Sequence, residues 1–195
     1  MAIWFRRCAT FEEEAEADRE YWRQFSADER LALVDDLRRD WTRMSNDPPP
    51  SRDFAEFLAC LRRHEVRALV VGAHALAVHA KPRFTKDLDV FIDASLENAT
   101  RLVAALDDFG FGTLGITAEE MSRPGEVVQL GFPPNRIDVM TRIDGVTFEE
   151  AWPHRVEATY AGEPAFFIGR EDLIRNKEAC ARPQDLADAD LLRRF

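Results

Sequence analysis

The sequence lacks an apolar run long enough to cross a membrane. Its longest weakly polar stretch, residues 69–80, is interrupted by Gly72, His74 and His79, and it is shorter than the ~20 residues that a spanning helix needs. The first residues lead directly into the acidic segment 12–18, without the apolar centre of a secretory signal. We therefore expect a cytoplasmic protein with no membrane partner.

Cysteine and positive charge are also scarce. Cys8, Cys60 and Cys180 are few and far apart, which fits neither a disulfide framework nor a zinc site. The 26 Lys and Arg residues against 36 Asp and Glu give a net charge of −10, so the whole-molecule field repels nucleic acid. A polyanionic ligand would need a local basic pocket, whereas a small nucleotide neutralised by Mg²⁺ remains compatible.

Three consecutive prolines, residues 48–50, divide the chain into a helical appendage (1–47) and a larger domain (51–195). Two segments of the appendage, Thr10 to Glu13 and Ser26 to Glu29, match the capping-box pattern that begins helices. The second helix carries an apolar stripe that an isolated hairpin cannot bury. The members of this stripe are Leu31, Val34, Leu37, Trp41 and Met44. Three interpretations explain it: the helix docks onto the larger domain, it forms an interface with a partner protein or a second copy, or it covers the active site.

The larger domain mixes helix-like and strand-like patterns, which predicts an α+β fold: a mixed sheet flanked by helices. One predicted helix begins after Ser51, which can cap it. The other predicted helices span 73–80, 96–109, 171–181 and 184–195. The predicted strands span 67–72, 87–93, 127–132, 136–143, 155–160 and 164–168.

Asp87 and Asp89 carry the strongest chemical signal. Residues two apart on a strand share a face, so both carboxylates can converge on a divalent cation, while Leu88 and Val90 pack on the other side. An exposed edge strand with solvated acids explains the pair equally well. Asp138, on a second predicted strand, would complete a three-carboxylate site if the two strands pair. Such a triad suits two-metal phosphoryl transfer, with one acid as a candidate base.

A glycine turn precedes these acids. Gly72 ends a predicted strand and is followed by Ala73, and such a turn lets main-chain N–H groups approach a phosphate at the start of a helix. Arg83, Thr85 and Lys86 lie between the turn and the acids. They contact phosphate or compensate charge in one interpretation and form a solvated loop in the other.

The segment Val71-Gly72-Ala73, thirteen residues, then Asp87-Leu88-Asp89-Val90 resembles the signature of the polymerase-β-like nucleotidyltransferase superfamily. The lead-in Arg83-x-Thr85-x-Asp87 is similar to that of minimal bacterial members, including abortive-infection-type enzymes of toxin–antitoxin pairs. The tail, with Lys177, Arg182-x-x-Asp185 and Asp188, resembles their closing pattern.

This resemblance implies Mg²⁺ or Mn²⁺ bound by Asp87, Asp89 and Asp138. It also implies that Gly72 approaches the nucleotide phosphates and that Lys177 reaches toward them from the tail. Lys177 as an ordinary surface lysine is the other interpretation, and a structural ion network at a helix end is the expected role of the remaining tail residues, Arg182, Asp185 and Asp188. Ala73 departs from the Gly-Ser or Gly-Gly of many catalytic members, because it offers a main-chain N–H but no hydroxyl.

We therefore expect an enzyme that transfers a nucleoside monophosphate from a nucleoside triphosphate to a hydroxyl of an unknown acceptor, with tRNA and a partner protein as candidates. One alternative is a non-catalytic, antitoxin-like module that keeps the fold for binding a partner. A more remote one is a glycosyltransferase that uses Asp87-x-Asp89 for its metal, in which the glycine turn and Asp138 would have no role.

Overall fold

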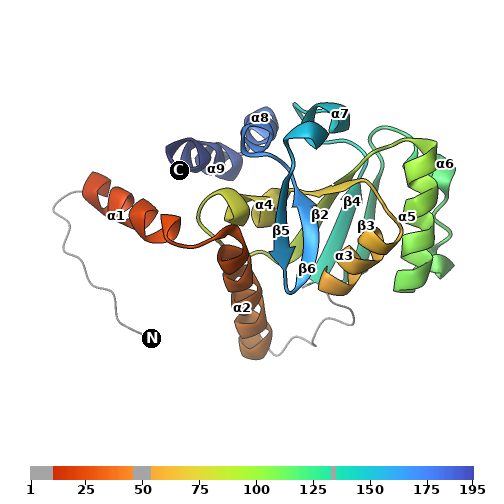
Figure 1. The fold of residues 1–195 in the computed structure, drawn as a ribbon, viewed down its shortest axis with the longest axis horizontal. Coiled ribbons are helices and arrows are strands. Elements are labelled where there is room, and N and C mark those ends of the chain that lie inside the picture. The colour runs from red at the N-terminus through yellow and green to blue at the C-terminus, as the bar shows by residue number, and fades with distance from the viewer. Residues whose placement is uncertain (1–10, 46–53, 133–134) are drawn as a thin grey trace.

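The computed structural model describes residues 11–45, 54–132 and 135–195. A six-stranded mixed sheet with the order β3-β4-β2-β1-β6-β5 lies at its centre. The strands are β1 (Ala68–Val70), β2 (Asp87–Ile92), β3 (Val127–Phe132), β4 (Asn135–Met140), β5 (Val156–Tyr160) and β6 (Glu163–Phe167). The α-helices are α1 (Phe11–Arg23), α2 (Ala27–Ser45), α3 (Phe54–Arg63), α4 (Gly72–His79), α5 (Leu96–Phe109), α6 (Ala118–Met121), α7 (Phe148–Ala151), α8 (Arg170–Cys180) and α9 (Pro183–Arg194). The arrangement confirms the predicted mixed sheet flanked by helices (Figure 1).

The acidic strand β2 lies inside the sheet between β1 and β4. It runs antiparallel to β1 and parallel to β4. The register of the parallel pair places Asp87 beside Arg136 and Asp89 beside Asp138. β3 and β4 form an antiparallel hairpin, and β6 joins β1 in parallel. The interpretation of β2 as an exposed edge strand is therefore wrong, because both of its edges are paired.

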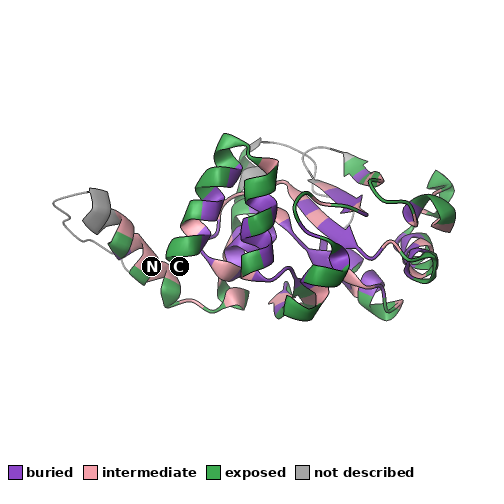
Figure 2. Cartoon of the chain, turned by 90° about the horizontal axis from the view of Figure 1, so that it is seen from above, coloured by how far each residue is buried: buried purple, intermediate pink, exposed green. Residues whose placement is uncertain are grey.

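Alternate residues of β2 meet different surroundings, as the period of a strand requires. Val90 is fully buried and lines a small apolar cavity with Leu58 of α3. Phe91, on the other face, contacts the ring of Phe148 in α7. Buried residues run through the strands and the inner sides of the helices (Figure 2). The two aspartates of β2 thus lie on the face that α7 flanks.

The helix α2 docks onto this core. Leu31 and Val34 are fully buried, whereas Leu37 and Met44 are 43% and 82% exposed, so two of the four described members of the stripe pack against the core. Arg30 binds the end of α4 by donating hydrogen bonds to the carbonyls of residues 77 (2.7 Å) and 78. The predicted cap at Ser26 is present, since its Oγ accepts a hydrogen bond from the N–H of Glu29. The boundary between the appendage (1–47) and the domain (51–195) stays a prediction.

Several sequence predictions lie outside the described residues: the caps at Thr10 and Ser51, the linker at 48–50 and the side chain of Trp41. Another was wrong in its limits. The strand predicted for 136–143 ends at Met140, because the chain then turns back through a short bridge between Ile143 and Val146. Gly145 makes this turn with a φ of +74°.

The two shortest α-helices, α6 and α7, were not predicted. Each begins with a capping box, built by Thr117 and Glu120 in α6 and by Thr147 and Glu150 in α7. In the part of the chain that the structure describes, no helix has both the length and the apolarity to span a membrane.

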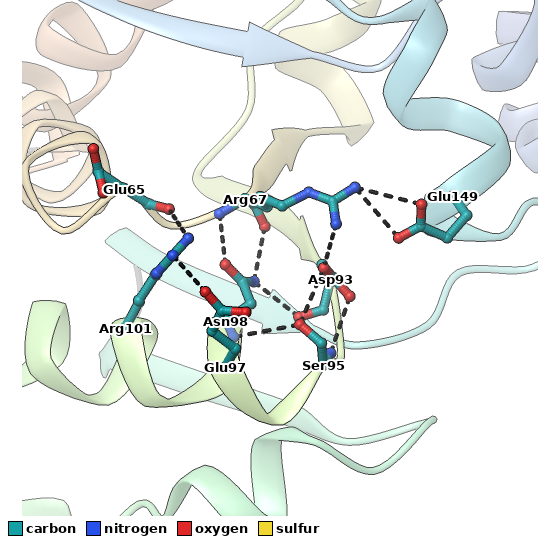
Figure 3. A network of polar contacts seen from close by, with 8 residues as sticks. All are labelled: Glu65, Arg67, Asp93, Ser95, Glu97, Asn98, Arg101 and Glu149. Carbon is teal, nitrogen blue, oxygen red and sulfur yellow. Dashed lines mark hydrogen bonds and ion pairs between the residues drawn. The ribbon is translucent and has the colours of Figure 1, made fainter.

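A polar network closes the other end of β2 (Figure 3). The buried amide of Asn98 in α5 accepts a hydrogen bond from the N–H of Arg67 at 2.7 Å and donates to the carbonyls of Arg67 and Asp93. The Arg67 guanidinium binds the Asp93 carboxylate at 2.7 Å and that of Glu149 in α7 at 3.3 Å. These bonds satisfy main-chain groups at the ends of β1 and β2, and they hold in place β2, the strand that carries Asp87 and Asp89.

Candidate metal and nucleotide site

The sheet brings the three predicted acids together on one face. Asp89 and Asp138 are register partners on neighbouring strands, which lie about 4.8 Å apart in a sheet. Asp87 precedes Asp89 by two residues and therefore points to the same side. All three line a cleft of about 710 Å³. The apolar cavity beside α3 contains none of the predicted site residues.

Burial raises the pKa of two of these carboxylates, Asp87 and Asp89. Burial, helped by the charges of Asp138 and Asp87, raises the pKa of Asp89 from 3.8 to about 6. Burial also raises the pKa of Asp87, although the charge of Arg136 opposes that effect. Like charges on one buried face lose this penalty when a cation neutralises them.

The turn before α4 lies directly against Asp89. The N–H of Val71 donates a 2.9 Å hydrogen bond to the Asp89 carbonyl. Gly72 has a φ of +62°, and a Cβ there would lie 2.1 Å from Oδ2 of Asp89. Glycine is therefore required by both conformation and space. The next residue, Ala73, lines the cleft at the first turn of α4, where free N–H groups favour an anion.

The segment between the turn and β2 contributes two of its three predicted residues to the cleft. Arg83 and Thr85 line it. The Thr85 hydroxyl donates a 3.2 Å hydrogen bond to the carbonyl of Asp87 and so fixes the start of β2. Lys86 is absent from the residues that line the cleft, but its positive charge opposes the rise in the pKa of Asp87 that burial causes. Phosphate binding by these residues stays a prediction.

Lys177 of α8 lies in the wall of the cleft and is only 5% exposed, so it is not an ordinary surface lysine. Its Nζ lies 2.8 Å from Asp185 and 3.2 Å from Asp188, both in α9. Arg182 pairs with Asp185, and Arg83 reaches Asp188 at 3.1 Å. The ion network predicted at this helix end is present, and it includes Lys177 and Arg83 as well. A contact of Lys177 with phosphate stays a prediction.

Sequence reasoning missed Arg136 as a site residue. Its Nη2 donates hydrogen bonds to Asp138 at 2.9 Å and to Asp87 at 3.3 Å, and its Nε lies 2.8 Å from Oδ1 of Asp138. The signal was available, because Arg136 precedes Asp138 by two residues and must share its face. Its second partner could not be read from the sequence, since the contact crosses between strands.

His74 lies behind the glycine turn and outside the cleft lining. It is fully buried between the rings of Phe54 and Tyr160, and neither ring nitrogen has a hydrogen-bond partner among the described residues. Burial, reinforced by the charges of Arg38 and Arg83, lowers the pKa of His74 to about 3. A neutral ring with this packing acts as a core side chain.

The residues present suit a hard divalent cation. Asp87, Asp89 and Asp138 offer only carboxylate oxygens, which Mg²⁺ and Mn²⁺ prefer. Oδ1 of Asp138 is buried and accepts no hydrogen bond from the described residues, although the Nε of Arg136 lies 2.8 Å away as an ion-pair partner. In the conformation described, however, no three His, Cys, Asp or Glu side chains in residues 11–45, 54–132 and 135–195 surround a common point as the ligands of one ion would.

No protein-family model matches the sequence, and a comparison with curated proteins finds no match. Among solved structures, the chain is similar to ANT(2″)-Ia, whose crystal structure holds adenylyl-2″-tobramycin. The similarity covers 70% of this chain and 83% of that chain, with 16% identity and a TM-score of 0.45. Because likeness at this level carries no functional weight, we base the assignment below on the carboxylates and the glycine turn.

Proposed function

We propose that this protein is a divalent-metal-dependent nucleotidyltransferase, which transfers a nucleoside monophosphate from a nucleoside triphosphate to a hydroxyl group of an acceptor. One observation carries the proposal. Asp89 and Asp138 are register partners, with Asp87 on the same face and a turn beside them at which only glycine fits. This combination provides oxygen ligands next to main-chain N–H groups that can bind phosphate.

The three aspartates would hold Mg²⁺ or Mn²⁺, which neutralises triphosphate charge and lowers the pKa of an attacking hydroxyl. The N–H of Ala73, at the start of α4, would bind a phosphate oxygen, with Arg83, Thr85, Lys86 and Lys177 as further candidates. The acceptor oxygen forms a bond to the α-phosphorus as the bond between that phosphorus and pyrophosphate breaks. Asp138 is the candidate base for the hydroxyl proton.

A finer assignment rests on two resemblances, that of the Arg83-x-Thr85-x-Asp87 segment and that of the tail from Lys177 to Asp188. It makes the protein a minimal bacterial enzyme of the toxin–antitoxin type, with tRNA or a partner protein as acceptor. Two exposed members of the α2 stripe, Leu37 and Met44, then offer a surface to a partner protein or a second copy.

The test is incubation with each labelled nucleoside triphosphate, Mg²⁺ or Mn²⁺, and total cellular RNA and protein. We expect label on one acceptor class with the wild type and none with the Asp87→Asn/Asp89→Asn variant. Asp144→Asn is the matched control, because Asp144 is an exposed carboxylate that lines the same cleft. It should keep the activity.

Calorimetric titration separates the remaining possibilities. Binding of metal and triphosphate without transfer to any acceptor would favour a non-catalytic binding module. Binding of neither ligand would overturn the proposal. Transfer that survives Asp138→Asn but fails with Asp89→Asn would favour the glycosyltransferase interpretation.

A further inference from the structure

Four charged side chains, rather than three, occupy the face that carries the site. On β2 they are Asp87 and Asp89, and on β4 they are Arg136 and Asp138, with each residue of one strand beside one of the other. The register itself sets this square, because register partners on paired strands lie on the same face and so do residues two apart on one strand. The backbone position of Arg136 beside Asp87 is therefore fixed by the strand register, whatever rotamer its side chain adopts.

The Arg136 guanidinium holds the place that a cation would take. Its Nη2 donates hydrogen bonds to Asp138 at 2.9 Å and to Asp87 at 3.3 Å, and its Nε lies 2.8 Å from Oδ1 of Asp138 as an ion-pair contact without a hydrogen bond. Two of the three candidate metal ligands thus share one positive group. Among the described residues, the acidic side chains do not surround a common ion position in this conformation.

A metal ion and this guanidinium cannot bind Asp87 and Asp138 in the same way at once. A divalent ion placed between them would repel the guanidinium at short range in a partly buried site. Arg136 lies at the wall of the cleft, and its side chain is 31% exposed, so it has room to move toward the open space. An anion in that space, such as a triphosphate, would supply the partner that it loses.

We propose that Arg136 is an exchangeable counter-cation, which neutralises Asp87 and Asp138 until a divalent metal replaces it and then binds the triphosphate. This inference rests on the proposed function and adds a rule for ligand binding. When metal binds alone, it displaces the Arg136 guanidinium, which is left without an anionic partner. When triphosphate binds with the metal, the displaced guanidinium can pair with the triphosphate. Each ligand therefore strengthens the binding of the other, and the coupling is the same in both directions.

The test is titration of the full chain with Mn²⁺, followed by electron paramagnetic resonance of the free ion. Each titration is made without nucleotide and with a saturating α,β-methylene triphosphate, which cannot be cleaved at the α-phosphorus. We compare wild type with Arg136→Gln. The matched control is Arg142→Gln, which removes the same charge from an exposed residue lining the same cleft. No ion pair of Arg142 with the three aspartates is found in the described part of the chain.

Arg136→Gln should bind Mn²⁺ alone at least tenfold more tightly than wild type, and the gain in Mn²⁺ affinity caused by the triphosphate should shrink at least tenfold. Arg142→Gln should change either quantity less than threefold. If Arg136→Gln fails to fold, Arg136→Lys replaces it. Its single ammonium cannot bind both carboxylates in the same forked way, so Mn²⁺ alone should again bind more tightly than to wild type.

Two results would overturn the exchange and leave the proposed function intact. In one, Mn²⁺ binds wild type and Arg136→Gln equally well without nucleotide. In the other, Arg142→Gln reproduces the whole effect, which would assign it to general cleft charge. Absence of Mn²⁺ binding in every variant, with and without triphosphate, would overturn the proposed function itself.

Discussion

Gly72 and Asp89 are in such close contact that a methyl group on the glycine would lie 2.1 Å from the Asp89 carboxylate oxygen Oδ2. The contact joins the start of α4 to the middle of β2. It places the candidate phosphate-binding turn directly against a candidate metal ligand. A change on either side of this contact must therefore affect the other.

Gly72→Ala is expected to abolish detectable triphosphate and metal binding, because the new methyl group displaces the Asp89 side chain or opens the turn. A destabilisation of roughly 1–3 kcal/mol from backbone strain accompanies this loss. Gly115→Ala is the matched control, since Gly115 has a φ of +69° and a Cβ added there would meet no described atom within 4 Å beyond its chain neighbours. Calorimetry of both variants makes the comparison. If Gly115→Ala lost ligand binding as well, the steric explanation would fail.

Asp89→Asn is expected to stabilise the metal-free protein above pH 6 while it removes metal binding. The folded-state pKa of about 6 exceeds the ordinary 3.8, so the folded protein holds a proton that the unfolded chain has lost. The stability contributed by Asp89 is therefore present below pH 3.8 and is lost as pH rises to about 6. A shift of this size corresponds to about 3 kcal/mol. Denaturant unfolding at pH 4.5 and 7.5, with chelator present, measures it, and an Asn variant less stable at pH 7.5 would contradict the prediction.

His74→Phe is expected to make the protein less sensitive to mild acid. The pKa of His74 falls to about 3 in the folded state against 6.5 ordinarily. The unfolded chain therefore gains a proton first, and stability falls as pH drops below 6.5. Between pH 6.5 and 5 the free energy of unfolding of the wild type falls by up to about 2 kcal/mol for this reason. The variant avoids this loss, because a phenylalanine between the rings of Phe54 and Tyr160 has no group to protonate. Denaturant curves at several pH values test this point, and parallel pH profiles for both proteins would refute it.

Lys177→Met is expected to destabilise the protein by about 1–3 kcal/mol, because Asp185 and Asp188 lose their shared buried cation and keep only Arg182 and Arg83, which are partly exposed. Addition of Asp185→Asn should restore part of that loss, since it removes one of the two buried negative charges. Arg193→Met should cost less than about 1 kcal/mol, because its pair with Glu178 is exposed on both sides. Chemical denaturation of the four proteins gives the comparison. A Lys177→Met variant as stable as the control would show that the network carries no stability, and would leave phosphate binding as the reason for the lysine.

Much of the fold follows from local pattern. The alternation around Asp87 and Asp89 predicts a strand, and the glycine at position 72 predicts a turn into a helix, because both signals lie within a few neighbouring residues. The helices α6 and α7 were missed, although Thr117 with Glu120 and Thr147 with Glu150 carry the capping pattern. Four-residue helices are too short to show a 3.6-residue period.

The site itself depends on pairing that local pattern does not contain. Asp138 meets Asp89 only because β2 and β4 run parallel with one register, and a slip by one residue would turn Asp138 to the opposite face. The contacts of Arg136 with Asp87 and of Arg83 with Asp188 depend on the same assembled geometry. The sequence therefore predicts the acidic residues of the site, but it does not predict that Arg136 pairs with Asp87 or that Arg83 pairs with Asp188.

The docking of α2 onto the core has a consequence during synthesis. Arg38 of α2 donates a 2.8 Å hydrogen bond to the hydroxyl of Tyr160 in β5, and 122 positions separate the two residues. At about 5–20 residues per second, roughly 6–24 s pass on the ribosome between one residue and the other. The packing of α2 against α4 can form earlier, because α4 follows α2 closely in the chain. The contact of α2 with β5 can form only after Tyr160 has been made, so the docking of α2 is completed late in synthesis.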